Sequence, residues 1–89
     1  MGASEITIEL FGIPRQRAGV AAIRLHADTL ADVVRQLDVS YPKLGLTQAD
    51  GTLSPHYLLS MNGACFVRDI RTSLPANARL LLLSADAGG

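Results

Sequence analysis

Two glycines at the end of the sequence, Gly88 and Gly89, have the residue type and the position that could support chemistry. Glycine has no Cβ, so a pair of glycines can pass through a channel too narrow for other residues and can adopt φ values that other residues avoid. The carboxylate of Gly89 would then be the functional group that is presented. Because a carboxylate is a poor electrophile, it would need adenylation by an ATP-using partner before sulfur or an amine could attack it.

The residues before these glycines are predicted to extend away from the domain instead of packing against it. Residues 85–89 contain no bulky apolar side chain, so we expect them to form a flexible tail behind a single domain of residues 1–84. Counted from Ser84, the last six residues span roughly 20 Å when extended. Ala87 and Gly88 would thread a passage, and Gly89 would reach the active site of another protein while the domain stays outside. The alternative is a frayed or truncated end without a function.

Side chains that often act as nucleophiles, bases or metal ligands are few in this sequence. Cys65 is the single cysteine, and we expect it to be a buried structural residue of a strand, because buried cysteine behaves as a small hydrophobe. His26 and His56 have no carboxylate partners at a useful spacing and are expected at the surface. No metal site, bound cofactor or catalytic cluster is therefore predicted, which disfavours an enzyme.

Length and charge narrow the class of protein further. Eighty-nine residues are enough for one domain with a modest core. Eight basic residues balance eight acidic ones, so a nucleic-acid binder with a basic face is not expected. No apolar run approaches the roughly 20 residues that span a bilayer, and the start of the sequence lacks the pattern of a signal peptide. These features predict a soluble cytoplasmic domain that contacts neither membrane nor nucleic acid.

The first half of the chain predicts two strands and a helix. Polar and apolar residues alternate over residues 5–10 and again over 20–26, a pattern typical of strands with one buried face. Residues 12–19 between them are predicted to form a loop, because glycine and proline punctuate this stretch. Apolar residues then recur at helical spacing over residues 29–37, and Pro42 is expected to end the helix.

The second half predicts a polar connector over residues 43–55 and then three strands. The strands are predicted over residues 57–61, 65–67 and 79–84. Asn62-Gly63 is expected to join the first two, because a type I′ hairpin turn needs positive φ at both of its central residues. Four consecutive leucines in the last strand predict a central strand that is covered on both faces.

Several short motifs carry a resemblance to a known family. They are Phe11, Arg15 and Gly19, then Thr29-Leu30, Tyr41-Pro42, Met61-Asn62-Gly63, Leu74, residues 79–83 and Gly88-Gly89. In order and spacing they resemble the β-grasp sulfur carriers, ubiquitin-like proteins that include the small subunit of molybdopterin synthase and the thiamine sulfur carrier. The similarity spans residues 6–89 and is greatest for the molybdopterin-synthase branch. Ala76-Asn77-Ala78 replaces a Gly-Asp pair that is common in the family, and residues 84–87 lack the proline-rich stretch of that branch.

The resemblance implies an α+β domain of β-grasp architecture, in which a mixed sheet of four to five strands packs on one main helix. The first and last strands are expected to lie side by side and parallel in the centre. Carriers of this family dock their partners through one sheet face, and exposed apolar patches often mark interfaces. The candidate residues for such a partner-binding patch are Leu59, Phe66, Leu81 and Leu83.

The resemblance also implies a co-substrate without catalytic side chains of its own. An adenylating enzyme of the ubiquitin-activating type would use ATP and magnesium on the Gly89 carboxylate. A persulfide donor would convert the product to a thiocarboxylate. An acceptor enzyme, such as the large subunit of molybdopterin synthase, would then take the sulfur. The chain itself would bind no cofactor.

Other functions are compatible with the same residues. The sulfur could go to cysteine, thiamine or another metabolite, or the chain could be a β-grasp binding module whose tail has no role. Protein tagging is a minor alternative, because Lys43 is the single lysine, which argues against lysine-linked chains of this protein. Arg15, Arg17 and Arg24 near the first hairpin could meet an acidic partner surface or form a solvated rim.

Overall fold

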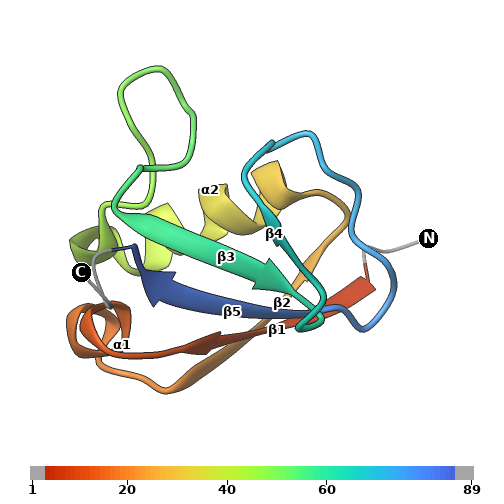
Figure 1. Cartoon of the computed structure of the whole chain (residues 1–89), viewed down its shortest axis with the longest axis horizontal. Coiled ribbons are helices and arrows are strands. Elements are labelled where there is room, and N and C mark those ends of the chain that lie inside the picture. Colours follow the sequence, from red (N-terminus) through yellow and green to blue (C-terminus); the bar gives the residue numbers. More distant parts are fainter. Residues whose placement is uncertain (1–3, 86–89) are drawn as a thin grey trace.

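The computed structural model describes residues 4–85. It contains a mixed five-stranded sheet with one main helix on one face (Figure 1). The strands are β1 (Ser4–Leu10), β2 (Ala22–Ala27), β3 (Tyr57–Met61), β4 (Cys65–Val67) and β5 (Arg79–Ser84). The helices are α1 (Ile13–Ala18), α2 (Leu30–Ser40) and the short 3-10 helix η1 (Pro42–Leu44). The strands lie in the order β2-β1-β5-β3-β4, and β1 and β5 pair in parallel. The predicted parallel pairing of the first and last strands is confirmed.

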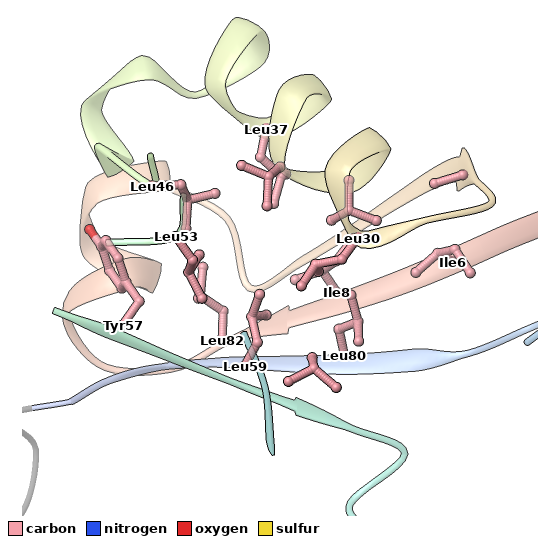
Figure 2. Packing of buried hydrophobic residues seen from close by; sticks show 14 of the residues in the cluster. Ile6, Ile8, Leu30, Leu37, Leu46, Leu53, Tyr57, Leu59, Leu80 and Leu82 are labelled. Atoms are coloured by element: carbon pink, nitrogen blue, oxygen red, sulfur yellow. The ribbon is translucent and has the colours of Figure 1, made fainter. Parts of the chain in front are cut away.

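Strand β5 shows how the two faces of the sheet differ. Leu80 and Leu82 are fully buried and face the core beneath α2 (Figure 2). Leu81 and Leu83 alternate with them and are half-buried on the opposite face. The prediction that β5 is covered on both faces is therefore wrong. A run of leucines indicates a central strand, but it does not reveal whether a second layer covers the other face.

Helix α2 begins where its first backbone N–H groups all find acceptors. The Thr29 hydroxyl accepts from the Asp32 N–H at 3.3 Å, and the Asp32 carboxylate accepts from the Asp28 N–H at 3.3 Å. This arrangement resembles a capping box, in which the side chains of the cap residue and of the third helical residue each accept a hydrogen bond from a backbone N–H of the helix start. Here the second N–H is that of Asp28, the residue before the cap. The amides of the first two helical residues donate to carbonyls of the β4–β5 connection. The helix start is thereby fixed to the end of the sheet.

The connection between β1 and β2 contains a helix, α1, where the sequence predicted a loop. Pro14 lies in its first turn, where the missing N–H is not needed. Gly19 ends it in the left-handed conformation, with φ of 79°, and its N–H donates to the Arg15 carbonyl at 2.9 Å. Proline near the start and glycine just past the end are helix signals, but six residues are too few to show a period.

The segment of residues 43–55, which begins inside η1, is more than the polar connector that the sequence predicted. Leu44, Leu46 and Leu53 are each at most 1% exposed and belong to the core (Figure 2 labels the last two). The Ser54 N–H donates to the Leu46 carbonyl at 2.7 Å, which closes the segment into a loop against the sheet. Its three buried leucines have neither strand nor helix spacing, so periodicity does not detect them.

Candidate functional site

Strand β5 ends next to α1 (Figure 1). We call its last residue, Ser84, and the following Ala85 the tail root, because the predicted tail continues from them. Ser84 pairs with Tyr57 of β3, and the Ala85 N–H donates to the His56 carbonyl at 2.8 Å. The chain is therefore held against β3 up to the last described residue. The reacting and threading residues predicted from the sequence, Gly89, Gly88 and Ala87, lie outside the described residues.

Tyr57 fastens the tail root from inside the protein. Its side chain is almost fully buried, and its hydroxyl donates to the carbonyl oxygen of Leu44. The same hydroxyl accepts a hydrogen bond from Arg17 Nη1 at 2.9 Å. The phenol thus joins β3, η1 and α1, three elements that are far apart in the sequence. These two hydrogen bonds consequently hold α1 and η1 against β3 next to the tail root.

The sheet face opposite α2 carries an apolar patch, which we name the open-face patch. Its members are Leu58, Phe66, Leu81 and Leu83. Leu83 of β5 pairs with Leu58 of β3, and Leu81 and Phe66 both pair with Ser60 between them. Paired residues of neighbouring strands lie on the same face within contact reach. Phe66 is 65% exposed, so a large aromatic surface is available there.

One of the residues predicted for this patch does not belong to it. Leu59 is 1% exposed and pairs with Leu82 and Val67, which are buried on the α2 side. Because successive strand residues point to opposite faces, its neighbour Leu58 faces outward instead. The sequence analysis missed Leu58, although the alternation that starts at buried Tyr57 carries that signal. Phe66, Leu81 and Leu83 do lie on the open face.

Exposed apolar side chains continue from the patch toward α1. Phe11 is 43% exposed, and its N–H donates to the Leu82 carbonyl at 3.1 Å. This bond extends the parallel β1–β5 register, which places Phe11 beside Leu83. Ile13, at the start of α1, is also exposed and lines a hollow with Ser84. Apolar surface therefore flanks the tail root.

Cys65 is exposed, so the prediction of a buried structural cysteine is wrong. It is the first residue of β4, an edge strand of three residues that pairs with β3 alone in the described sheet. No described element covers this end of the strand. Membership of a strand does not imply burial when the strand is short and lies at an edge.

Clusters typical of metalloproteins are not found in the described part of the chain. Within residues 4–85, no three His, Cys, Asp or Glu side chains come together in a way that could hold a metal ion. Nor does this part contain a helix of the length and apolar character needed to cross a bilayer.

No family model and no curated protein sequence matches this chain. Its structure is similar to SAMP1 from Haloferax volcanii, with a TM-score of 0.81 and 23% identity, covering 97% of this chain and 100% of that one. It is also similar to small archaeal modifier protein 1 from Methanosarcina acetivorans, with a TM-score of 0.81, 22% identity and coverage of 100% and 99%. A putative molybdopterin converting factor subunit 1 from Pyrococcus furiosus matches with a TM-score of 0.74, 14% identity and coverage of 92% and 98%.

At these identities the similarity establishes the fold. The neighbours and this chain cover nearly all of one another, so the shared arrangement includes the sheet and α2 rather than a fragment of them. The predicted ubiquitin-like β-grasp fold is confirmed, and so is the structural resemblance to β-grasp proteins that include a molybdopterin converting factor subunit.

Proposed function

We propose that this chain is a sulfur carrier, activated at the Gly89 carboxylate by an ATP-dependent adenylating enzyme and serving molybdopterin biosynthesis. One observation carries the proposal furthest: β5 presents Leu81 and Leu83 on the open face and then leads directly toward the Gly-Gly sequence. A partner that binds the open-face patch is thereby positioned next to the tail root. The similarity to a putative molybdopterin converting factor subunit supports the choice of pathway.

The length of chain beyond the scaffold suits delivery into a deep active site. The Ala85 N–H donates to the His56 carbonyl, and Gly89 is the fourth residue after Ala85. Four extended residues span about 13 Å. Ala87 has only a methyl side chain and Gly88 has none, so this stretch can pass through a narrow channel. The carboxylate can then reach ATP while the β-grasp body stays at the enzyme surface.

The chemistry requires an activated carboxylate, and the partners supply the reagents. An oxygen of the Gly89 carboxylate attacks the α-phosphorus of magnesium-bound ATP and displaces pyrophosphate. The terminal sulfur of a persulfide on the donor attacks the acyl carbon, and AMP leaves. The new bond is a C–S bond, so the chain is now joined to the donor through the S–S bond of the former persulfide. A second donor thiol then attacks the donor sulfur of that S–S bond, which releases the thiocarboxylate and leaves a disulfide on the donor. The net change replaces one carboxylate oxygen by sulfur.

Protein modification is the second candidate function. Two of the similar structures are named small archaeal modifier protein 1, and this observation favours it. An amine would attack the same acyl-adenylate at Gly89, which releases AMP and forms an amide. Both candidates therefore depend on the same terminal carboxylate and differ in the product. A β-grasp binding module, by contrast, would function without Gly89.

Intact mass spectrometry distinguishes these functions. The chain is incubated with ATP, magnesium, a persulfide donor and a candidate adenylating enzyme of the ubiquitin-activating type. The carrier function predicts a mass gain equal to the exchange of one oxygen for one sulfur, localised to Gly89. An adduct of the chain with an amine would instead establish modification. Absence of any product with a panel of such enzymes would contradict both and favour the binding module.

Two variants test the role of the carboxylate itself. Deletion of Gly89, or addition of one residue after it, should abolish sulfur incorporation, and one residue added before Met1 serves as the matched control. All three proteins should unfold at the wild-type temperature, because the buried side chains lie within residues 6–82 of the described part. Sulfur incorporation by the deletion variant would contradict activation at Gly89.

A further inference from the structure

Three cationic side chains lie on α1 and η1, and α1 contacts both η1 and β5. Together we call them the basic collar: Arg15, Arg17 and Lys43. Arg17 lines a hollow of about 270 Å³ with Ser84, the last residue of β5. It lines a second hollow, of about 410 Å³, with Lys43 of η1. Arg15, also on α1, lines a third hollow of about 490 Å³. The tertiary structure thus brings α1, η1 and the end of β5 into one cationic surface.

The collar cations are not neutralised within the described residues. The ion pairs found there involve Arg35, Arg71 and Arg79, none of which belongs to the collar. No described residue that lines the three hollows is Asp or Glu. The side-chain partner of Arg17 is the neutral hydroxyl of Tyr57. Asp86 follows in the sequence, outside the described residues.

Four of the seven Asp and Glu residues of the described part gather at the other end of the molecule. Asp28 and Asp32 lie at the start of α2, and Asp69 lies in the connection that donates carbonyls to that helix start. Glu5 lies near the beginning of β1. Figure 1 shows that the beginnings of β1 and α2 are at the opposite end of the molecule from α1. Of the other three, Glu9 pairs with Arg79, and Asp38 and Asp50 accept hydrogen bonds from Thr47 and Thr52. The charged side chains that line the three hollows near the tail root are thus cationic in the described part.

We propose that the basic collar docks on an acidic protein surface that surrounds the entrance through which the adenylating enzyme takes up the tail. This inference rests on the proposed function. An enzyme that receives the tail must face the end of the molecule from which the tail leaves. The collar is about 13 Å of extended chain behind Gly89, so it meets the rim of the entrance rather than the ATP. Three cations are too few for a nucleic-acid interface, which neutralises many phosphates.

Charges at the rim of an interface act mainly on the rate of encounter and on the choice of partner. Their effect decreases as salt is added, because the screening length is about 8 Å at physiological ionic strength. The collar should consequently raise kcat/KM for the carrier at low ionic strength without changing kcat. This split separates a docking role from a role in the chemical step.

The test uses the charge-reversal variant Arg15→Glu/Lys43→Glu. Both side chains are exposed and neither takes part in a hydrogen bond or ion pair within the described residues, so the fold should persist. Arg17 is left unchanged because it bonds Tyr57. ATP–pyrophosphate exchange is measured with the adenylating enzyme that acts on the wild-type chain. We expect kcat/KM at low ionic strength to fall by about tenfold or more, with kcat unchanged and the difference lost at high salt.

The matched control is Arg35→Glu/Arg71→Glu, which changes the net charge by the same amount away from the tail root. This control should retain the wild-type kcat/KM. An equal loss in both double variants would show an effect of net charge alone and would overturn the collar. A wild-type kcat/KM in the collar variant would overturn it too, while the proposed function would stand. If no enzyme adenylates the wild-type chain, the proposed function fails with it.

An NMR titration tests binding of an acidic partner by the basic collar without an enzyme assay. A short glutamate peptide should shift the amide signals of α1 and η1 in the wild-type chain and in the Arg35→Glu/Arg71→Glu control. The collar variant should show no such shifts. Stronger responses of the same amides to duplex DNA or to anionic lipid vesicles would favour a phosphate-bearing partner and would overturn an acidic protein as the occupant.

Discussion

Asn62 and Arg79 exchange two hydrogen bonds that fasten the β3–β4 turn to the start of β5. The Asn62 N–H donates to the Arg79 carbonyl at 2.7 Å, and the Arg79 N–H donates to Asn62 Oδ1 at 2.8 Å. Asn62 and Gly63 have φ of 54° and 69°, as the sequence predicted for this pair. The strand pairing resumes at Met61 and Cys65, so the loop is one residue longer than a two-residue hairpin turn. The Asn62 side chain thus links the turn to the strand that leads to the tail.

Replacing Asn62 by alanine should lower the free energy of unfolding by about 1–2 kcal/mol, because alanine tolerates the left-handed conformation poorly and offers no acceptor to Arg79. Asn62→Gly is the matched control: it also loses the acceptor but accepts φ of 54° without strain. Urea unfolding should therefore rank wild type above the glycine variant and the glycine variant above alanine. Equal stability of the two variants would show that φ at this position has no cost.

Neighbouring leucines of β5 should respond differently to truncation. Leu80→Ala should cost about 2–5 kcal/mol of unfolding free energy, because a fully buried side chain leaves a cavity. Leu81→Ala should cost less than about 1.5 kcal/mol, because its site is half open to solvent. On the proposed function, Leu81→Ala should also raise KM for the adenylating enzyme. Equal destabilisation by the two changes would mean that the assignment of the sheet faces is incorrect.

A charge on α2 should unfold the domain or leave it intact according to the face that carries it. Val34 is 3% exposed and Val39 is 77% exposed on the same helix. Val34→Asp places a carboxylate without a partner in a small core, so circular dichroism should show an unfolded chain. Val39→Asp, the matched control, should keep the wild-type spectrum. A folded Val34→Asp protein would contradict the packing of this helix on the sheet.

Asp32 should make the stability of the domain depend on pH in the acid range. The backbone N–H of Asp28, and then Arg35, lower the pKa of Asp32 from its ordinary value of 3.8. A carboxyl whose pKa is lower in the folded state stabilises that state above its unfolded pKa, and this contribution is lost as the pH falls through the folded pKa. The stability gap between wild type and Asp32→Asn should thus be full at neutral pH and should shrink below pH 3.8. A gap that is independent of pH in urea titrations would contradict this assignment.

Removal of the Tyr57 hydroxyl should loosen the tail root. Tyr57→Phe deprives the Leu44 carbonyl and Arg17 of their partner, and should cost about 1–3 kcal/mol of unfolding free energy. Tyr41→Phe is the matched control, because the Tyr41 hydroxyl makes no hydrogen bond within the described residues. Hydrogen exchange of the Ala85 amide should be faster in the first variant. Unchanged exchange and stability would show that the phenol does not support the root.

Much of the secondary structure was predictable because its signals are local. Alternation in β1 and helical spacing in α2 appear within a few residues, and the Asn62-Gly63 pair encodes its own φ values. Helix α1 was missed because six residues are too short for a period, and the buried leucines of the segment of residues 43–55 have no regular spacing. Their burial depends on where that segment lies on the sheet.

The sequence by itself determined the order of the five strands and the main helix and the terminal Gly-Gly candidate, because these follow from patterns read along the chain. The parallel pairing of β1 with β5 was expected from the resemblance to β-grasp proteins. The tertiary structure alone decided that Leu58 faces outward instead of Leu59, and that Cys65 is exposed at a sheet edge. It alone placed Arg17 beside Lys43 at the tail root. The physical reason is that the face, the edge and the charge of a surface depend on register and packing between segments that are distant in the sequence.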